Sequence, residues 1–506
     1  MTRDHYPGGR ADARLPETPA RALLASTMQT AMLWNLLGVV LSQGFGFLVF
    51  LVLATKLPPE VVGVVALASM VTDFVAVDGR SACMDAIVQA GHDGARHLNS
   101  AFAAFFSVAL IVSLGAISAS SIMAETFNEP LISGFMRVFA LLILPIPWLA
   151  VMDALLMKDL QFRQFTQRNI AASLIAGICG IAWTFTPWVI WALVVQRVVG
   201  LAAEAVLEFH MTRWFPTWSI DWKDAVQFLR RLFALWTILL ITQTIGRAIT
   251  FVFGLRYDAA TVGLMRAASR IVEAVQVPVV SSLMGLWFPL MSKVSGNLKY
   301  ERDIYNNIIR TAVFLCFPVF AGMALVADDI VRLLLSDRYQ DAGPMIEAIA
   351  TTRLLVPIVW FNTIAMTSLA MNRLSMLYSA AALIVELLSL IVFTRLSAPE
   401  ALLLVPAPTI VGGIIGNVVL NRRLGQSNWS HYRELMPAVF ATLGMVACTW
   451  TFRTLAVDSS TLWRLGGSVL IGVVVYLGWL AVFNRRWLLE RIRLLRGRDA
   501  DAMEIV

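Results

Sequence analysis

KLPPEVVGVVALAS, at residues 56–69, has a related copy in RYDAATVGLMRAAS, at residues 256–269. Four positions are identical at a constant spacing of 200 residues, and at a fifth a lysine is replaced by an arginine. A second pair, Ala124-Glu125 and Ala327-Asp328, falls at corresponding steps of the apolar pattern described below. Chance identity is an alternative in such apolar sequence. Otherwise the spacing indicates a duplicated unit of six helices, as in transporters built from internal repeats.

The composition of the 506-residue chain is typical of a membrane protein. Hydrophobic residues make up 58% of it, charged residues make up 14%, and the mean hydropathy is +0.73. Soluble domains carry about 25% charged residues. These values exclude a disordered tail protein, a basic nucleic-acid binder and a secreted disulfide scaffold, so no nucleic acid is expected as a partner. The widely spaced cysteines predict neither a disulfide framework nor a metal site: Cys83, Cys179, Cys316 and Cys448.

Apolar runs of sufficient length to cross a bilayer recur along the whole chain. A helix needs roughly 20 residues to span about 30 Å of hydrocarbon. The runs are too long for barrel strands and lack a two-residue alternation, so they predict an all-α polytopic membrane protein. There are fourteen such runs, at residues 31–54, 61–78, 101–123, 131–152, 169–186, 188–209, 232–255, 260–288, 308–327, 344–371, 374–394, 401–420, 435–455 and 464–484.

Lysine and arginine are distributed unevenly among the connections. With the N-terminus inside, the inner connections and tails hold 27 of the 40 basic residues and the outer connections hold eight. Because basic residues favour the cytoplasmic side of short loops, this bias predicts an even number of spans with both termini in the cytoplasm. The remaining five are arginines within the predicted spans: Arg197, Arg247, Arg266, Arg270 and Arg353.

These patterns divide the chain into two lobes with flanking segments. The predicted segments are a cytoplasmic tail without a cleaved signal (1–27), an N-lobe of six spans (28–210), a cytoplasmic interfacial linker (211–231), a C-lobe of six spans (232–430), two further spans (431–484) and a basic cytoplasmic tail (485–506). In the linker, Trp214, Trp218 and Trp222 recur every four residues. This spacing predicts a helix anchored at the lipid headgroups, and a tryptophan-rich linker without a helix is the alternative.

Motifs for common enzymatic chemistry are missing from the sequence. It contains no G-x-x-x-x-G-K-[ST] phosphate loop, no H-E-x-x-H, no G-x-S-x-G, no C-x-x-C and no Rossmann glycine pattern. The five histidines lie in tails, loops or span ends, without metal-ligand or proton-relay spacing. We therefore expect a transporter and not an enzyme, with no catalytic residue, no cofactor, no metal and no ATP hydrolysis of its own.

Ionisable residues inside the predicted spans are candidates for a binding site, because each costs a few kcal/mol at a helix centre. Arg266, Arg270 and Glu273 share one helix face. Arg270 and Glu273 could simply neutralise one another, and Arg247 and Arg353 could snorkel or bond backbone carbonyls. The C-lobe spans nevertheless carry an excess of basic residues, and arginine forks onto phosphate oxygens. The sequence therefore predicts a cationic cavity for an anionic solute, lined by Arg247, Arg266, Arg270 and Arg353.

A carboxylate that couples transport to an ion gradient must alternate between a charged and a neutral form. Asp73 has no basic residue one helical turn away, whereas Glu204 lies two turns from Arg197 and is interpreted as its structural partner. Asp73 is therefore a candidate for ion coupling, and Glu273 is a second candidate. A polar bond from Asp73 to a neighbouring helix is the alternative interpretation.

Scattered positions across residues 25–425 form a recognisable pattern. They are Leu57-Pro-Pro-Glu-Val-Val-Gly63, Phe162-Arg163, Gly263 with Arg270, Phe288-Pro289-Leu-Met-Ser292, Pro318 with Gly322, and Ala327-Asp-Asp-Ile-Val-Arg332-Leu-Leu-Leu335 followed by Arg338-Tyr339. This pattern resembles the Wzx/WzxC-type polysaccharide exporter family of the multidrug/oligosaccharidyl-lipid/polysaccharide flippase superfamily. The sequence departs from the pattern at Met265, where family members often carry an aromatic residue, and at Ala248, where polar residues are common.

The resemblance implies a flippase of the bacterial inner membrane. Such a protein would move polyprenyl-pyrophosphate-linked oligosaccharide repeat units across the bilayer by alternating access, without ATP hydrolysis, for exopolysaccharide, capsule or lipopolysaccharide synthesis. Sugar hydroxyls and phosphates cannot cross hydrocarbon unpaired, whereas the prenyl tail can stay in lipid. The implied partners are the lipid-linked oligosaccharide, the bilayer, and a polysaccharide polymerase with its export machinery.

Two other functions stay open at this point. One is a membrane polymerase or glycosyltransferase acting on lipid-linked sugars, for which outer carboxylates are offered by Asp328, Asp329, Asp337 and Asp341. The other is a different exporter of the same superfamily, for drugs or a peptidoglycan precursor.

Overall fold

The computed structural model describes residues 38, 40–91, 94–217, 219–294, 298–369, 371–393 and 395–483. The predicted tails at 1–27 and 485–506, and also Trp218, lie outside the described residues. Within the described ranges the regular structure is helical throughout, with no strand. The prediction of an all-α membrane protein is therefore confirmed.

The first bundle contains helices that begin at prolines or bend near them. Its elements are a helix Val40–Lys56, α2 Pro59–Ser69, a π-helical turn Phe74–Gly79, α3 Arg80–Ala90, α4 Ala95–Thr126, α5 Pro130–Leu142, α6 Ile146–Lys158, α7 Phe162–Trp183, a 3₁₀ turn Val189–Trp191 and α8 Ala192–Thr212. Pro59 and Pro130 open α2 and α5, where the missing N–H has no helical acceptor anyway. The chain bends by 55° between α2 and the π-helical turn, and by 44° between α5 and α6.

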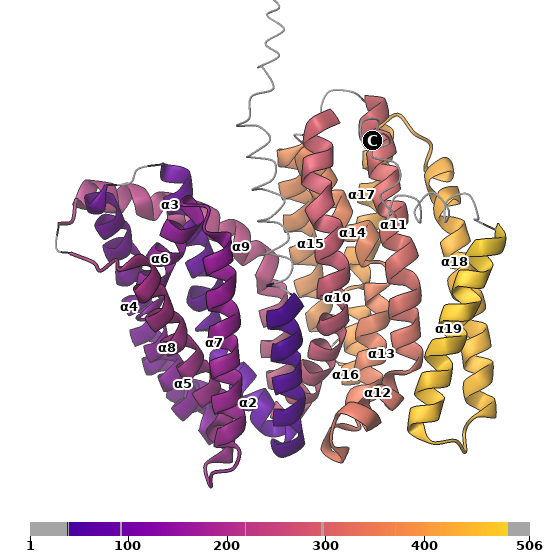
Figure 1. Ribbon diagram of the computed structural model, residues 1–506, viewed down its shortest axis with the longest axis horizontal. Coiled ribbons are helices and arrows are strands. Elements are labelled where there is room, and N and C mark those ends of the chain that lie inside the picture. Colours follow the sequence, from indigo (N-terminus) through magenta and orange to yellow (C-terminus); the bar gives the residue numbers. More distant parts are fainter. Residues whose placement is uncertain are drawn as a thin grey trace, which may run out of the picture.

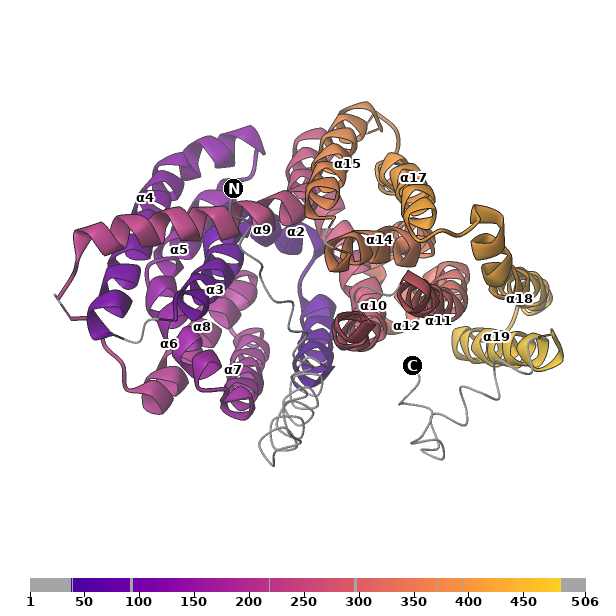
Figure 2. The same ribbon diagram turned by 90° about the horizontal axis from the view of Figure 1, so that it is seen from above.

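The second bundle lies beside the first, and two further helices flank it (Figures 1 and 2). The remaining elements are α9 Trp222–Arg256, α10 Ala259–Val294, α11 Leu298–Leu325, α12 Ala327–Leu334, a 3₁₀ turn Asp337–Tyr339, α13 Ala342–Arg353, α14 Val356–Ser368, α15 Asn372–Phe393, α16 Ala398–Leu404, α17 Ala407–Arg423, α18 Asn428–Leu455 and α19 Thr461–Phe483. Helix α9 runs along the first bundle and ends beside α15 (Figure 2), so it ties the bundles together.

The connection between the lobes differs from the predicted interfacial helix. Helix α8 ends at Thr212 and α9 begins at Trp222, so Trp214 lies in a segment without helix. The carboxylate of Asp221 accepts hydrogen bonds from the backbone N–H groups of Lys223 and Asp224, which fixes the start of α9. A single helix through all three tryptophans is therefore wrong.

Long apolar helices make this a multi-pass membrane protein. Among the described residues, eight helices are long and apolar enough to cross a membrane, or up to 11 if each bent pair counts as one span. Each predicted run overlaps a helix or a consecutive pair of helices. The helix that overlaps the first run, Val40–Lys56, is shorter than a full span in the described part. The number fourteen stays a prediction.

The two copies of the internal repeat pack against each other where the lobes meet. A Cβ atom on Gly63 would clash with the carbonyl oxygen of Ala259, and one on Gly263 would clash with that of Pro59. The two contacts are reciprocal at the spacing of 200 residues, so α2 and α10 cross on a local two-fold axis. Only glycine allows backbones to approach this closely.

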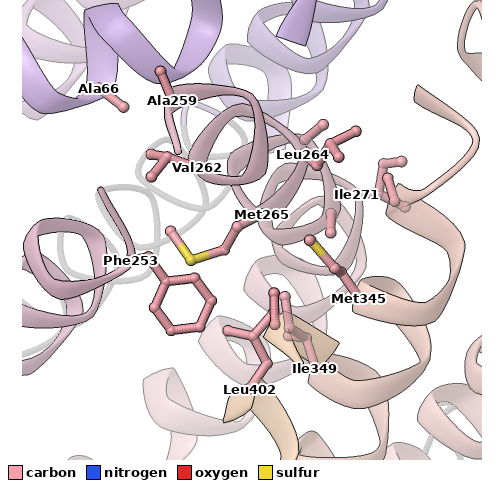
Figure 3. Packing of buried hydrophobic residues seen from close by; sticks show 14 of the residues in the cluster. Ala66, Phe253, Ala259, Val262, Leu264, Met265, Ile271, Met345, Ile349 and Leu402 are labelled. Atoms are coloured by element: carbon pink, nitrogen blue, oxygen red, sulfur yellow. The ribbon is translucent and has the colours of Figure 1, made fainter. Parts of the chain in front are cut away.

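Hydrophobic side chains from both lobes continue this contact into a shared core. Ala66 of α2 and Phe253 of α9 lie with Val262 and Met265 of α10 in one cluster (Figure 3). Met265 is buried beside Phe253, so the departure from the aromatic residue of the family pattern is accommodated within the interface between the lobes.

Hydrogen bonds close the same end of the molecule. Tyr339 donates its hydroxyl hydrogen to the carbonyl oxygen of Leu57 at 3.1 Å, and Ser336 donates to that of Ala54 at 3.2 Å. The 3₁₀ turn after α12 in the second bundle is therefore attached to the end of the helix Val40–Lys56. In the predicted topology this is the outer end.

A polar cavity between the lobes

A cavity of about 980 Å³ lies between the two bundles. Its walls come from the helix Val40–Lys56 and from α2, α3 and α5 to α10, together with the π-helical turn. The polar side chains of its lining are Gln43, Ser69, Thr72, Asp73, Arg80, Gln196, Arg197, Glu204, Gln243, Arg266, Ser269, Arg270 and Glu273. A polar chamber of this size inside an apolar bundle is the natural candidate for a binding site.

The internal repeat places one serine and one carboxylate from each lobe in this cavity. Ser69 and Asp73 line it from the N-lobe, and Ser269 and Glu273 line it from the C-lobe at the same spacing of 200 residues. A spacing of four puts serine and carboxylate on one helical face, and Ser69 donates a hydrogen bond to Asp73 at 3.2 Å. Extending the sequence comparison by four residues would have shown that Asp73 and Glu273 are equivalent.

The two copies differ in their basic residues. Arg266 and Arg270 stand where the first copy has Ala66 and Met70, so only the C-lobe copy adds guanidinium groups to the cavity. The Nε atom of Arg266 is buried and has no hydrogen-bond partner among the described residues. Arg266 lines the cavity and forms no ion pair among the described residues, so its guanidinium is a candidate to bind an anionic ligand.

Arg270 and Glu273 do not neutralise each other by direct contact. Both side chains are exposed in the cavity wall, and no ion pair joins them among the described residues. The acidic groups that act electrostatically on Arg266 are Asp73 and Glu273, one from each lobe. The charge of Arg266 is therefore balanced both across the cavity, by Asp73, and within α10, by Glu273.

The ion pairs of the N-lobe differ from those inferred along single helices. Asp73 is not free, because Arg197 of α8 donates a hydrogen bond to it at 2.8 Å. Glu204, expected to pair with Arg197, accepts instead from Arg80 of α3 at 2.6 Å. Both partners come from neighbouring helices, and spacing within one helix cannot reveal such pairs.

Two of the four predicted arginines lie away from the cavity lining. Arg247 binds Asp78 on the π-helical turn, and its guanidinium stacks over Phe74 at 4.1 Å from the ring centroid. Its Nη2 atom also donates to the backbone carbonyl oxygen of Asp73 at 3.4 Å, which is one of the alternatives that the sequence left open, and Arg247 is not among the residues that line the cavity. Arg353, at the end of α13, also does not line the cavity and acts electrostatically on Glu273 and Glu386.

A charged cluster that the sequence did not predict adjoins the cavity in the N-lobe. Arg80 donates to Asp153 at 2.6 Å as well as to Glu204, and Arg168 donates to Asp153 at 2.6 Å and contacts Glu208. Both were counted among the basic residues of the inner connections, because they fall just outside the predicted apolar runs. They lie in α3 and α7, where carboxylates of α6 and α8 offset the cost of burial.

The C-lobe contains a second buried polar network, made of neutral side chains. Asn417 donates to the hydroxyl oxygen of Tyr305 at 2.6 Å, and Tyr305 donates to Asn362 at 2.9 Å. Asn421 donates to Asn417 at 3.0 Å, and His431 contacts Asn417 at 3.4 Å. The network joins α11, α14, α17 and α18.

The chemistry of the cavity suits a ligand with both phosphate and hydroxyl groups. Its lining contains four arginines and three carboxylates, which gives one net positive charge. Arginine forks bind phosphate oxygens, and the amides of Gln43, Gln196 and Gln243 can both donate to and accept from sugar hydroxyls. The described part of the chain contains no group of histidine, cysteine and acidic side chains that could hold a metal.

The amino-acid sequence is similar to those of proteins from polysaccharide biosynthesis. The chain is 23% identical over 334 residues to the succinoglycan biosynthesis transport protein ExoT of Rhizobium meliloti (strain 1021), which covers 65% of this chain and 67% of that protein. It is 18% identical over 347 residues to the lipopolysaccharide biosynthesis protein WzxC of Escherichia coli (strain K12), over 64% of this chain and 66% of that one. These matches confirm the resemblance to polysaccharide exporters.

The fold is similar to that of a solved flippase structure, and the sequence matches a family model. The lipid II flippase MurJ, in an inward closed conformation, superposes with a TM-score of 0.75 at 16% identity, over 90% of this chain and 99% of that chain. At this identity the match establishes the fold alone. The family model described as "Polysaccharide biosynthesis protein" matches residues 52–344, which is more than half of the chain. The chain therefore belongs to this family of polysaccharide biosynthesis proteins.

Proposed function

We propose that this protein is a flippase that carries polyprenyl-pyrophosphate-linked oligosaccharides across the membrane through the cavity between its lobes. The prenyl tail stays in lipid while the pyrophosphate and sugars pass through the cavity, because those groups cannot cross hydrocarbon without partners. The two lobes separate alternately at their two ends, so the cavity opens to one side of the membrane at a time. No ATP hydrolysis by this chain takes part.

The observation that carries the proposal is the polar cavity itself. Arg266 and Arg270 supply guanidiniums for pyrophosphate, and Arg266 has an unused buried donor among the described residues. The contact of Gly63 with Gly263 closes the end of the molecule where the lobes meet, as alternating access requires of one end at a time. The candidates for ion coupling, Asp73 and Glu273, face the same space from equivalent positions of the repeat. Asp73 is ion-paired with Arg197, whereas Glu273 forms no ion pair among the described residues.

The proposal includes a location, an orientation and partners. The protein acts in the bacterial inner membrane with both termini in the cytoplasm, as the distribution of basic residues favours. It delivers its cargo to a polysaccharide polymerase and export machinery on the outer side. Fusions of alkaline phosphatase after Arg21 or after Arg498 test the orientation, since phosphatase activity at either position contradicts it.

The alternative of a membrane enzyme is less well supported than a flippase, because Asp329, one of the outer carboxylates, is already bound by arginines. Asp329 is fully buried and is bound by Arg453 of α18 and Arg464 of α19. Burial alone would raise the pKa of Asp329, but hydrogen bonds from Arg464 and Arg453 outweigh it and hold the pKa below its ordinary value. Such a carboxylate stays ionised and occupied, so it attaches helices to one another and is not available as a general acid or base.

A deletion strain distinguishes flippase from enzyme. Loss of a flippase leaves complete lipid-linked repeat units in the inner leaflet, whereas loss of a polymerase leaves them flipped but unpolymerised. The identity of the accumulated lipid also separates the present proposal from an exporter of drugs or of a peptidoglycan precursor. Leaflet-resolved analysis of the lipid-linked sugars is the measurement, and accumulation in the outer leaflet contradicts the proposal.

Point variants in that strain test the cavity. Arg266→Ala should reduce export about tenfold or more, since a lost charged hydrogen bond to the ligand costs about 1.5–3 kcal/mol. Arg266→Lys should recover only part of the activity, because an ammonium lacks the fork. Arg137→Ala is the matched control, since Arg137 bonds to Ser120 and Ser121 away from the cavity. Equal export by Arg266→Ala and Arg137→Ala at equal protein level contradicts the assignment.

A further inference from the structure

The charged cluster of the N-lobe contains more carboxylates than guanidiniums. It comprises Arg80 of α3, Asp153 of α6, Arg168 of α7, and Glu204 and Glu208 of α8. With every group ionised, three negative charges face two positive charges. All five side chains are buried or partly buried, with Arg168 at 2% and Glu208 at 0% exposure. An uncompensated charge at such a depth costs several kcal/mol.

Glu208 is the member with the weakest coordination. Its Oε2 atom has no hydrogen-bond partner among the described residues, and its Oε1 atom is ion-paired with Arg168 and lies 3.6 Å from Nη2 of Arg80. By contrast, Asp153 accepts hydrogen bonds on both oxygens, from Arg80 and Arg168. Both guanidiniums therefore hold Asp153 with hydrogen bonds, and the excess negative charge falls on Glu208.

Cys83 of α3 lies close enough to the cluster for Asp153 to act on it electrostatically. Asn169 of α7 accepts hydrogen bonds from Arg168, so the Nε and Nη2 atoms of that guanidinium are already engaged. Further along α8, Arg197 is engaged with Asp73 and so does not supply the missing positive charge.

We propose that this cluster is a proton-binding site, with Glu208 as the residue that holds the proton, and that it exchanges the proton with the cavity by way of the Glu204 carboxylate. Glu204 and Arg80 belong to both places, since they form the cluster and also line the cavity. Protonation forms one O–H bond on a carboxylate and brings the cluster from a net charge of −1 to zero.

The proton site is linked to the anionic cargo, and this part rests on the proposed function. When Glu208 takes up a proton, the wall behind Arg80 loses one negative charge, so the cavity binds an anion more tightly. Linkage is reciprocal, so a bound anion raises the proton affinity of the cluster by the same factor. The N-lobe would then sense both the proton and the pyrophosphate group through the same guanidinium, that of Arg80.

Infrared spectroscopy of the full-length protein in lipid tests the proton site without any transport. The parent should show the C=O stretch of a protonated carboxylic acid at neutral pH, and this band should disappear as the pH is raised. Glu208→Gln should lack the band, whereas Glu273→Gln, which alters a carboxylate outside the cluster, should keep it. Absence of the band in the parent at neutral pH overturns the proposal.

The variants also separate Glu208 from its neighbours. Glu208→Gln keeps the shape of a protonated glutamic acid and should fold with the yield of the parent. If the band is lost in Asp153→Asn or Glu204→Gln but kept in Glu208→Gln, the assignment to Glu208 is wrong. If Glu208→Gln does not fold, the pH titration of the band in the parent still decides whether the cluster holds a proton.

Calorimetry with inorganic pyrophosphate tests the linkage. Binding to the purified full chain is measured at the midpoint pH of the infrared titration, where the site is half protonated. Buffers of different ionisation enthalpy then give the number of protons taken up. The parent should take up more protons than Glu208→Gln, and the difference cancels the protons that pyrophosphate itself exchanges. Equal uptake overturns the linkage. If neither protein binds pyrophosphate, the proposed cargo site fails as well, while the infrared result still decides the proton site.

Discussion

The two lobes are equivalent in fold but are stabilised by different polar chemistry. The N-lobe interior contains the charged cluster of Arg80, Asp153, Arg168, Glu204 and Glu208, which adjoins the cavity. The C-lobe interior contains the neutral network of Tyr305, Asn362, Asn417, Asn421 and His431, none of which lines the cavity. The duplication therefore preserved the helix packing and the glycine contact, but not the interior polar groups.

This difference indicates a division of labour. A network of amides with satisfied hydrogen bonds specifies one arrangement of its helices and carries no net charge. A cluster with an excess carboxylate changes its charge with a single proton. We therefore expect the C-lobe to act as a rigid body that also holds α18, and the N-lobe to respond to pH and to the cargo.

The largest effect should follow from removing a cation of the N-lobe cluster. Arg168→Ala leaves three carboxylates with one guanidinium and should cost about 3–5 kcal/mol of stability, the range for a broken buried ion pair. The midpoint of thermal unfolding in detergent measures this cost. Adding Asp153→Asn to the Arg168→Ala variant should recover part of the loss, because it removes the negative charge that Arg168 had paired. No recovery would show that the loss comes from packing alone.

The charged site of the C-lobe around Asp329 should lose its contribution to stability in acid. Asp329→Asn should cost about 1.5–3 kcal/mol at neutral pH through weaker hydrogen bonds to Arg453 and Arg464. Because the folded-state pKa of Asp329 lies below that of the unfolded chain, its stabilisation is present above about pH 4 and is lost as the pH falls through the folded-state value. Unfolding measured over a pH series should therefore show parent and variant converging only in acid.

The neutral network of the C-lobe should tolerate pH but not the loss of an amide. Asn417→Leu keeps the approximate volume but removes the donor to the hydroxyl oxygen of Tyr305 and the acceptor of one hydrogen bond from Asn421, at a cost of about 1–3 kcal/mol. The cost should be the same throughout the alkaline range, where His431 is neutral. A cost that changes there would contradict the distinction between the two lobes.

The smallest effect should come from the hydrogen bond that attaches one lobe to the other. Tyr339→Phe removes the donor to the carbonyl oxygen of Leu57, which is worth about 0.5–1.5 kcal/mol. The equilibrium should shift toward separation of the lobes at this end by about two- to tenfold. In a cysteine-free background, the labelling rate of Ser269→Cys by an impermeant thiol reagent from the outer side measures the shift. An unchanged rate would show that this bond does not help to close the cavity.

Sequence alone predicted the elements but not the partners of the charged residues. The repeat at residues 56–69 and 256–269, the all-α class and the cavity positions of Arg266 and Arg270 could all be inferred from spacing. The pairs of Arg247 with Asp78 and of Arg197 with Asp73 could not, because each joins helices far apart in sequence. The pairing of Arg80 and Arg168 with carboxylates was missed for a similar reason, since a basic residue near a predicted span end has the same pattern whether it meets water or a buried carboxylate.

The central claim is that lipid-linked oligosaccharides cross the membrane through the cavity between the lobes. The direct measurement uses proteoliposomes that contain the purified protein and a labelled polyprenyl-pyrophosphate oligosaccharide, with an impermeant enzyme outside that cleaves the exposed sugar. We expect the parent and Arg137→Ala to expose sugars of the inner leaflet well above the rate of protein-free vesicles, and Arg266→Ala to do so about tenfold more slowly. A parent rate equal to that of protein-free vesicles, or no difference between the two arginine variants, would contradict the account.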